Sequence, residues 1–292
     1  MRRKTIVSAL ALCSAVGCLP AVAGSASAAP RYRDYVALGD SYASIASLLT
    51  VEDKVGCFRS ADNYPHVLAA KLGVERLTDV SCGSATTAHM TEPQRTPTLG
   101  TNPAQFDALR PETDLVTLTI GGNDLGFESV IGQCGLLSVT DPLGNPCERA
   151  NRNPDGSDKV RRKIEQEVAP RVAAVVRGIK ERSPDARVLL VGYLRWLPEA
   201  TGCWPAVPLA QGDVPYATSL QQALVDVLAG NAGGNVSAFD PMPITGHDMC
   251  QAPGTRWVEP VVPAAPTTPF HPNALGQRNL GERLAERLGG TR

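Results

Sequence analysis

Aromatic side chains are scarce in this chain of 292 residues, and neither sign of charge dominates it. Phe, Tyr and Trp make up only 5% of the residues and form no cluster on which a sugar would stack. Lys and Arg number 28 against 29 Asp and Glu, so there is no basic excess with which to bind nucleic acid or an anionic membrane surface. No segment beyond the first thirty residues is apolar for long enough to be a transmembrane helix. We therefore expect neither a nucleic-acid partner nor a stable membrane anchor.

The first 28 residues are predicted to be a secretory signal peptide that takes no part in the fold. They begin with three cations at positions 2–4, continue with an apolar run at 6–16 that is too short to span a membrane, and end in Ala-Ser-Ala at 26–28. We expect cleavage after residue 28 or 29 and a secreted, extracellular protein. A lipoprotein acylated on Cys18 is the alternative. It is less favoured, because the residues before this cysteine match the usual acylation site poorly.

Six cysteines remain beyond the predicted signal peptide: Cys57, Cys82, Cys134, Cys147, Cys203 and Cys250. An even number in an exported chain indicates disulfides. None lies in a Cys-x-x-Cys pair or beside a useful histidine, so we expect no metal site. Six cysteines allow fifteen pairings. We favour sequential pairing, because each pair then joins one long loop region to its neighbour.

Strand-like and helix-like segments alternate along the rest of the chain. The expected strands are Asp34–Leu38, Leu77–Cys82, Leu115–Ile120, Val188–Leu194 and Val236–Phe239. The expected helices are Tyr64–Leu72, Ala104–Leu109, Asp158–Arg182, Tyr216–Leu228 and Asn273–Leu288. The last three strands are apolar on both sides of the pleat, as in a sheet covered on both faces. This alternation predicts an α/β fold with a doubly wound, five-stranded parallel sheet, in one domain spanning residues 29–292.

Three segments do not fit the alternation and are expected to be long loops. Gly132–Pro154 is rich in Gly, Pro and Asn, and Arg195–Pro215 and Gly246–Pro269 are rich in Pro. All three contain cysteines, so disulfides are expected to staple them. Loops of this length are often functional. An ordinary surface role is an equally good interpretation.

The first expected strand ends in a polar tripeptide, within "YVALGDSYAS" at residues 35–44. Gly39, Asp40 and Ser41 are common turn residues. They also stand at the carboxyl edge of a parallel sheet, where open α/β folds bind their ligands. Ser41 is therefore a candidate nucleophile. Among the four histidines, His271 is the best candidate for its base, because it directly precedes Pro272 at the start of the last expected helix.

Two further expected strands also end in small and polar residues. "TIGGND" at 119–124 places Asn123, a side-chain amide donor, after two glycines. "SCGSATT" at 81–87 offers a main-chain N–H of Gly83 or Ser84. A serine nucleophile that attacks an ester needs such donors for the negative charge that develops on the carbonyl oxygen. A Gly-rich turn with an Asn cap is the structural alternative.

Taken in order, these segments resemble the four blocks of the SGNH or GDSL hydrolases. The amino-acid sequence is most similar to that of secreted actinobacterial lipases and esterases of that superfamily. The similar segments are "YVALGDSYAS", "CFRSADNYPHVLA", "LTDVSCGSATT", "VTLTIGGNDLGF" and "HPNALGQ". The resemblance covers about Asp34 to Leu288. It implies a flavodoxin-like three-layer sandwich that hydrolyses carboxylic esters, with no cofactor, through a covalent acyl-enzyme.

The resemblance also assigns roles to single residues. Ser41 becomes the nucleophile and donates its own N–H to the oxyanion, Asn123 supplies the side-chain amide, and His271 is the base. The family's three disulfides, carried over in sequential order, imply the pairs Cys57–Cys82, Cys134–Cys147 and Cys203–Cys250.

The chain departs from the family pattern in two places that bear on the site. Relatives usually read Cys-Ser-Gly-Ala-Thr in the second block, whereas Gly83 precedes Ser84 here, so either N–H is a candidate for the oxyanion hole. Many members carry Asp three residues before the histidine, where this chain has Thr268. We therefore expect a Ser41–His271 dyad in which the main-chain carbonyl of Thr268 orients the imidazole.

The leading hypothesis is a secreted, monomeric lipase or esterase. A carbohydrate O-acetylesterase of the same superfamily is the first alternative, weakened by the scarcity of aromatic residues. The second is a catalytically inactive binding protein on the same scaffold. The joint presence of Ser41, Asn123 and His271 disfavours this second alternative.

Overall fold

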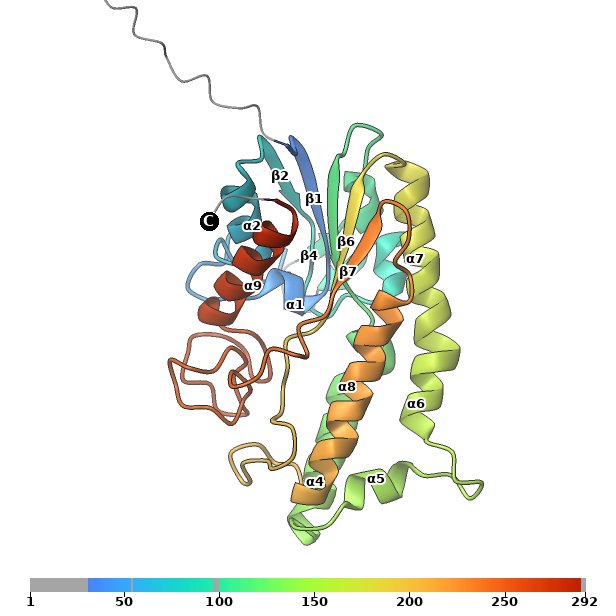
Figure 1. Ribbon diagram of the computed structural model, residues 1–292, viewed down its shortest axis with the longest axis vertical. Helices are drawn as coiled ribbons and strands as arrows, with labels where there is room; N and C mark the ends of the chain where they lie inside the picture. Colours follow the sequence, from blue (N-terminus) through green and yellow to red (C-terminus); the bar gives the residue numbers. More distant parts are fainter. Residues whose placement is uncertain (1–30, 54, 97–99, 290–292) are drawn as a thin grey trace, which may run out of the picture.

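A five-stranded parallel sheet lies at the centre of the protein (Figure 1). The structure, a computed structural model, describes residues 31–53, 55–96 and 100–289, so the predicted signal peptide lies outside the described residues. The strand order is β2-β1-β5-β6-β7. The strands are β1 (Asp34–Gly39), β2 (Arg76–Asp79), β5 (Leu115–Thr119), β6 (Arg187–Val191) and β7 (Val236–Phe239). The predicted α/β class is confirmed.

The burial of each strand explains the patterning seen in the sequence. In the middle of the sheet, β1 and β5 are buried along their whole length, and β6 is buried after its first residue. These strands have a helical layer on each face, so apolar residues point both ways. The edge strands β2 and β7 are only partly buried.

Helices cover both faces of the sheet (Figure 1). On one face α2 (Tyr64–Leu72) packs against α9 (Ala274–Arg287). On the other lie α7 (Ala169–Arg182) and the upper part of α8 (Val214–Ala229). The buried valine and isoleucine side chains of α7 form the apolar stripe expected for a helix lying on a sheet. The long helix predicted from Asp158 begins at Lys159 as α6 (Lys159–Lys163) and reaches α7 through a π-helical turn at Ile164–Val168.

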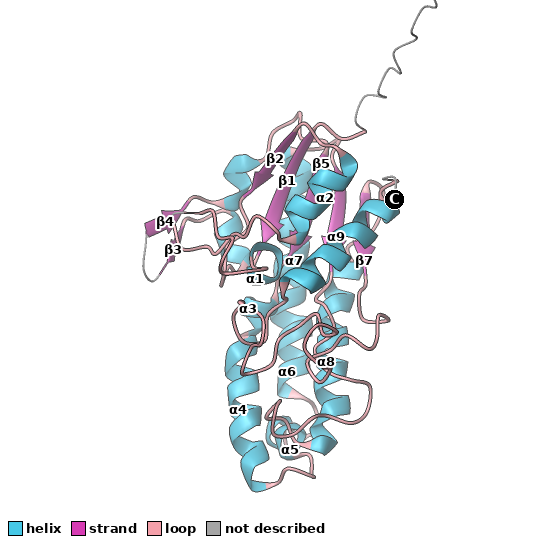
Figure 2. Cartoon of the chain, turned by 90° about the vertical axis from the view of Figure 1, so that its left-hand side faces the viewer, coloured by secondary structure: helices cyan, strands magenta, loops and turns pink. Residues whose placement is uncertain are grey.

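A group of helices projects beyond the carboxyl edge of the sheet (Figures 1 and 2). We call this group the helical extension; it comprises α4 (Phe127–Thr140), α5 (Pro146–Asn151), α6 and the N-terminal half of α8. The expectation of a long loop at Gly132–Pro154 is therefore wrong. Gly135 of α4 allows a close approach, since a Cβ there would come within 3.3 Å of the carbonyl oxygen of Pro208.

Two smaller differences concern the segment between β2 and β5. The helix expected at Ala104–Leu109 is a short 3-10 turn, Gln105–Ala108. A small antiparallel hairpin, β3 (Gln94–Thr96) with β4 (Gly100–Asn102), was not anticipated. Short 3-10 turns and three-residue strands carry too little periodicity to be recognised in a sequence.

Two disulfides join loops to each other, and a third joins two helices. They link Cys57 to Cys82, Cys134 to Cys147 and Cys203 to Cys250, which is the sequential order expected from the sequence. The second lies inside the helical extension, between α4 and α5. In the part of the chain that the structure describes, no helix is both long enough and apolar enough to cross a membrane.

Candidate active site

The structure brings Ser41 and His271 together at the carboxyl edge of the sheet. Ser41 follows β1 as the first residue of the short helix α1 (Ser41–Ser44), and His271 lies just before α9. The Oγ of Ser41 is 2.8 Å from the Nε2 of His271, although 230 residues separate them. A serine and an imidazole at this distance form the pair that a nucleophile and its base require.

The local sequence explains the sharp turn that presents Ser41. Gly39 has a φ of 147°, and a Cβ there would lie 2.6 Å from the carbonyl oxygen of Thr119 on β5. The side-chain amide of Gln105 holds both main-chain groups of Gly39, at 2.8 and 2.9 Å. Asp40 then caps α1, because its Oδ1 accepts the N–H of Tyr42 at 2.9 Å. Gly39 and Asp40 are thus required by the geometry of the turn.

His271 is oriented by a main-chain carbonyl, but not by the expected one. Its Nδ1 lies 2.7 Å from the carbonyl oxygen of Pro269, which can only accept, so Nδ1 carries the proton and Nε2 is free to accept from Ser41. The carbonyl of Thr268 instead accepts the main-chain N–H of His271 at 3.3 Å. The assignment of Thr268 is therefore corrected to Pro269.

No carboxylate contacts His271 among the described residues, and Glu259, which precedes it on the same loop, is fully engaged elsewhere. Glu259 is buried and bonds to Arg256, to Asn273 and to the N–H of Ala264. Its own main-chain N–H donates to the carbonyl of His271 at 3.0 Å. Burial alone would raise the pKa of Glu259, but the hydrogen bonds from Arg256, Asn273 and the N–H of Ala264, with the charge of Arg256, together outweigh it and lower the pKa. Glu259 therefore shapes the loop that carries His271.

The surroundings of His271 favour its neutral form. Burial lowers the pKa of His271, because the imidazolium loses its hydration there, and this outweighs the hydrogen bond to Pro269, which would raise it. A neutral imidazole at neutral pH is ready to accept a proton from Ser41.

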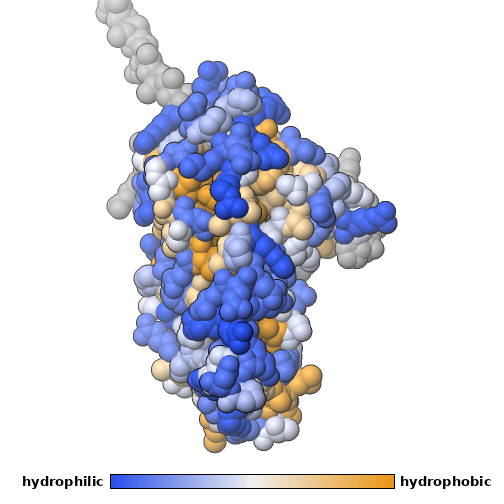
Figure 3. All heavy atoms as spheres, turned by 90° about the vertical axis from the view of Figure 1, so that its right-hand side faces the viewer, coloured by the Kyte–Doolittle hydropathy of each residue, from blue (hydrophilic) through white to orange (hydrophobic). Residues whose placement is uncertain are grey.

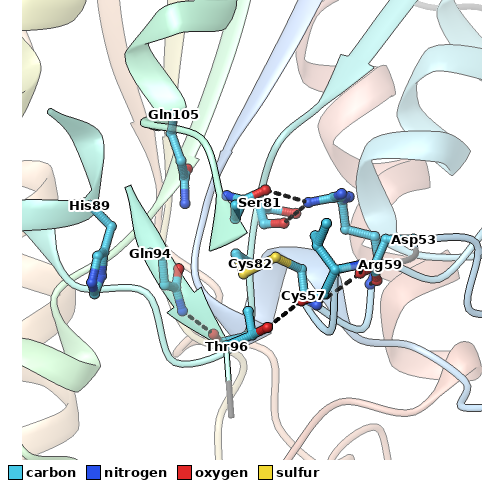
Figure 4. The surroundings of a disulfide bond; sticks show 12 residues. Asp53, Cys57, Arg59, Ser81, Cys82, His89, Gln94, Thr96 and Gln105 are labelled. Carbon is cyan, nitrogen blue, oxygen red and sulfur yellow. Dashed lines mark hydrogen bonds between the residues drawn. A yellow bond between two sulfur atoms is a disulfide. The ribbon is translucent and has the colours of Figure 1, made fainter. Parts of the chain in front are cut away.

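The loop after β2 contains the two main-chain N–H groups that the sequence offers for the oxyanion hole. Gly83 is not free, since its N–H donates to the carbonyl of Cys57 at 2.9 Å and its carbonyl accepts from Gln94 at 2.7 Å. The disulfide Cys57–Cys82 fixes the same loop (Figure 4). For the N–H of Ser84 the structure shows no acceptor among the described residues. Of the two candidates that the sequence left open, Gly83 is therefore wrong and Ser84 is retained.

Ser84 adopts a backbone conformation that usually belongs to glycine. Its φ is 62°, in the left-handed region, and its side chain is exposed. A residue held there at a turn is typical of functional sites.

Asn123 lies in α3 (Gly122–Leu125), which follows β5 directly. One hydrogen of its side-chain amide is used, because Nδ2 donates to the carbonyl of Ala85 at 2.8 Å. The second hydrogen remains for a ligand. The neighbouring Asp124 accepts from both the hydroxyl and the N–H of Thr87. These bonds join the loop that follows β2 to the helix α3 that follows β5.

A buried hydrogen-bond network connects the nucleophile turn to the Asn123 segment. Tyr193, which follows β6, donates from its hydroxyl to Oδ2 of Asp40 at 2.5 Å and accepts the N–H of Gly122 at 2.8 Å. Burial raises the pKa of Asp40 to about 7, although the Tyr193 hydrogen bond lowers it. The sequence analysis missed Tyr193, because no motif surrounds it and only the fold brings it to Asp40.

Two other residues that sequence reasoning missed tie the His271 side to the Ser41 side. The hydroxyl of Tyr42 donates to the carbonyl of Phe270 at 2.6 Å. Gln277 of α9 donates to the carbonyls of Tyr42 and Ile45 at 2.8 and 2.7 Å. Tyr42 belongs to the segment "YVALGDSYAS" and Gln277 to "HPNALGQ", so both lie in segments that carry the family resemblance.

The remaining histidines take part in local structure. His66 bonds to Asn63 at the start of α2, His89 accepts the N–H of Thr86, and His247 stacks on Trp257. Among the described residues, no group of three or more His, Cys, Asp or Glu side chains is arranged to hold a metal ion.

Comparison with known proteins places this geometry in a family. Residues 37–278 match the GDSL-like Lipase/Acylhydrolase family. The chain is 43% identical to Lipase 2 of Streptomyces coelicolor over 265 residues, which cover 88% of this chain and 86% of that protein. It is 31% identical to the Lipase of Streptomyces rimosus over 281 residues, 94% of each chain.

Solved structures agree with the sequence relatives. The phospholipase A1 of Streptomyces albidoflavus superposes with a TM-score of 0.69 at 27% identity, covering 88% of this chain and 99% of that one. The extracellular lipase of Streptomyces rimosus superposes with the same score, identity and coverage. The chain therefore belongs to the GDSL-like lipase/acylhydrolase family of ester hydrolases, and its five-stranded sheet with flanking helices is the SGNH hydrolase fold.

Proposed function

We propose that the protein cleaves carboxylic acyl esters through a Ser41–His271 dyad and a covalent acyl-enzyme. The observation that carries the proposal is the 2.8 Å contact between Ser41 Oγ and His271 Nε2, with Nδ1 of the same ring held by Pro269. This arrangement leaves one unprotonated nitrogen, and that nitrogen faces the serine hydroxyl.

In the first step Ser41 Oγ attacks the ester carbonyl carbon while its proton moves to Nε2 of His271. The carbonyl oxygen becomes an oxyanion, which accepts hydrogen bonds from the N–H groups of Ser41 and Ser84 and from the Asn123 amide. The C–O bond to the alcohol then breaks, and Nε2 returns its proton to the departing alkoxide. The products are an alcohol and an acyl ester of Ser41.

In the second step a water molecule takes the place of the alcohol. His271 removes a proton from the water, the resulting hydroxide attacks the acyl carbon, and the same donors stabilise the second oxyanion. Breaking the bond to Ser41 Oγ releases the carboxylic acid, and His271 returns its proton to the serine. In this mechanism the Pro269 carbonyl takes the orienting role of a triad carboxylate, without adding a negative charge.

Replacing Ser41 with Ala tests the mechanism. We expect Ser41→Ala to lower the turnover of p-nitrophenyl butyrate by about 10³-fold or more, because no other group can form the acyl-enzyme. Ser44→Ala, in the same short helix, serves as the matched control and should retain activity. A fluorophosphonate should label the wild type and Ser44→Ala on Ser41 and leave Ser41→Ala unlabelled. Labelling of another serine in the active protein would contradict the proposal.

We also propose that the protein is a secreted monomer, a single domain of residues 29–292 that follows a signal peptide at 1–28. Its three disulfides support this, since such bonds persist in oxidising compartments. One relative of the same fold is described as an extracellular lipase. N-terminal sequencing of protein recovered from culture medium, together with its mass in solution, tests these points.

A further inference from the structure

The tight turn at residues 82–85, which we call the Ser84 turn, is held in its conformation by groups other than Ser84 itself. The φ of Ser84 is 62°, in the left-handed region that disfavours a residue with a Cβ. Among the described residues, neither its N–H nor its hydroxyl has a hydrogen-bond partner. Such a conformation persists only where the surrounding structure fixes it. The contacts that hold Ser84 in place must therefore come from its neighbours.

Cys82 connects the Ser84 turn to the turn that presents the nucleophile. Its carbonyl accepts the N–H of Ala85 at 3.1 Å, which closes the Ser84 turn. Its own N–H donates to the carbonyl of Gly39 at 3.0 Å, two residues before Ser41. The position of the Ser84 N–H relative to Ser41 thus depends on where Cys82 is held.

The disulfide bond fixes Cys82 to Cys57, and both side chains are fully buried. Cys57 makes a second link to the same turn, because its carbonyl accepts the N–H of Gly83 at 2.9 Å. The carbonyl of Gly83 accepts from the side-chain amide of Gln94 at 2.7 Å. One covalent bond and two hydrogen bonds therefore fix the two residues that precede Ser84.

Cys57 is itself fixed by the carboxylate of Asp53. One carboxylate oxygen accepts the N–H of Cys57 at 2.8 Å, and the other accepts the N–H of Arg59 at 2.7 Å. Figure 4 shows Asp53 and Arg59 on one side of the disulfide and Gln94 on the other. The disulfide therefore attaches the Ser84 turn to a loop that has its own internal anchor.

We propose that the disulfide Cys57–Cys82 is a positioning element of the oxyanion hole, which holds the N–H of Ser84 towards the carbonyl oxygen of the ester. The proposal rests on the ester hydrolysis proposed above and adds a group that acts through Ser84 without touching the substrate. Without the disulfide, the φ of Ser84 can relax to negative values, which rotates the peptide plane that carries its N–H. Neither of the other two disulfides includes a residue of the Ser84 turn. Loss of the first disulfide should therefore slow the chemical step, whereas loss of another should lower stability alone.

Removing single disulfides by alanine substitution tests the proposal. Cys57→Ala with Cys82→Ala is the test variant; alanine is chosen because a serine hydroxyl at these two buried positions would lack a partner. Cys203→Ala with Cys250→Ala is the matched control, since this pair also joins two loops. We expect kcat of the test variant for p-nitrophenyl butanoate, assayed below its Tm, to fall by about 10- to 100-fold, with KM within about threefold. The control should keep kcat within about twofold, although the Tm of both variants falls.

Two further measurements distinguish positioning from a general loosening of the fold. Butylboronic acid forms a tetrahedral adduct with Ser41 that places an oxygen in the oxyanion hole, so its Ki should rise in the test variant by about the factor by which kcat falls. Ser84→Gly should raise kcat of the test variant by about threefold or more, because glycine adopts a φ near 62° at little cost. The same substitution should give no such gain while the disulfide is present.

Three results would overturn the proposal. The first is a folded test variant that loses no more kcat than the control; the second is a loss confined to KM; the third is no gain from Ser84→Gly. If the test variant does not fold, Asp53→Ala makes the same test, because it frees Cys57 and leaves the disulfide intact. We then expect kcat to fall by about threefold to tenfold, and an unchanged kcat would overturn the proposal. Asp62→Ala, which removes a carboxylate bonded to Thr50 in the same loop, is the control for this variant.

Labelling with a fluorophosphonate separates this inference from the proposed function. If the reagent does not label the wild type on Ser41, the Ser41 mechanism itself fails. If it labels the wild type, but the test variant turns over the ester as fast as the control does, only the positioning role of the disulfide fails.

Discussion

The sheet edge and the helical extension are built from opposite kinds of interaction. At the sheet edge, Ser41, Asn123 and Ser84 follow three different strands, and hydrogen bonds involving Tyr193, Gln105 and Asp124 fix the segments that carry them. In the extension, an apolar cavity is lined mainly by aliphatic and aromatic side chains, and the disulfide Cys134–Cys147 forms part of its wall. Hydrogen bonds depend steeply on distance and angle, whereas apolar packing depends mainly on volume. The geometry of the first region is therefore set mainly by directional contacts, and that of the second mainly by the volumes of its side chains.

The apolar character of the helical extension is also visible on the surface of the molecule. Figure 3 shows apolar atoms at the far end of the molecule, where Leu136 and Val139 of α4 and Leu143 in the turn after it are exposed. Variants in the two regions should therefore differ in kind. Sheet-edge variants should change the turnover of every ester, whereas truncations in the extension should mainly lower the stability of the fold.

Asn123→Ala should have the largest effect among the sheet-edge variants that keep the nucleophile. We expect kcat to fall by about 10²–10³-fold on the p-nitrophenyl esters of butanoate and dodecanoate alike, because one donor to the oxyanion is lost. Asn279→Ala, an equivalent truncation on α9, is the control and should change kcat by less than about twofold. Steady-state kinetics on both esters measure this. A loss that appears only in KM, or only with the longer ester, would assign Asn123 to substrate binding instead.

Tyr193→Phe should have an intermediate effect that marks it as a positioning residue. Removing the hydroxyl leaves Asp40 Oδ2 and the N–H of Gly122 without their partner, so the turn at Ser41 and the start of α3 lose their common anchor. We expect kcat to fall by about tenfold on both esters, and KM to stay within about twofold. A loss of stability with no loss of kcat would erase the distinction between the two regions.

The same network predicts how stability depends on pH. Burial raises the pKa of Asp40 from 3.8 to about 7, so the folded protein holds this proton more tightly than the unfolded chain does. The stability that Asp40 contributes is therefore fully present below about pH 4 and is lost as the pH rises through about 7, on the order of a few kcal/mol. The difference in unfolding free energy between wild type and Asp40→Asn, measured in urea from pH 4 to pH 9, should follow this curve. In Tyr193→Phe the loss should extend to higher pH, because the hydrogen bond that lowers the pKa is gone; a flat difference would contradict the assignment.

The smallest effects are expected from the carboxylates near the His271 loop. Asp240→Asn and Asp248→Asn should each lower kcat by less than about tenfold, because the Pro269 carbonyl already holds Nδ1 of His271. Loss of a triad aspartate, by contrast, lowers kcat by about 10⁴-fold. Kinetics on butanoate, with circular dichroism to verify folding, distinguish the two cases. A loss near the triad value in either folded variant would replace the dyad by a triad.

How much of the site was predictable depends on how local its determinants are. Ser41, Asn123 and His271 each stand at the end of an apolar run or before a helix-starting proline, so strand ends and a parallel sheet suffice to bring them to one edge. The choice between Gly83 and Ser84 was not predictable, because it depends on whether the carbonyl of Cys57 already occupies one N–H. The choice of Pro269 over Thr268 depends likewise on the turn that the main chain makes before His271.

The sequence by itself determined the α/β class and the central strands and indicated the serine and histidine proposed to be catalytic, because hydrophobic periodicity and turn chemistry act over a few neighbouring residues. It did not reveal α4 and α5, since Gly132, Gly135 and Pro146 weaken the local preference for a helix. Only the tertiary structure decided these helices, through the packing of α4 on the other elements of the extension and its disulfide to Cys147. The same holds for Tyr193 and the apolar cavity of the extension, because a buried partner or a cavity exists only when segments far apart in the chain meet.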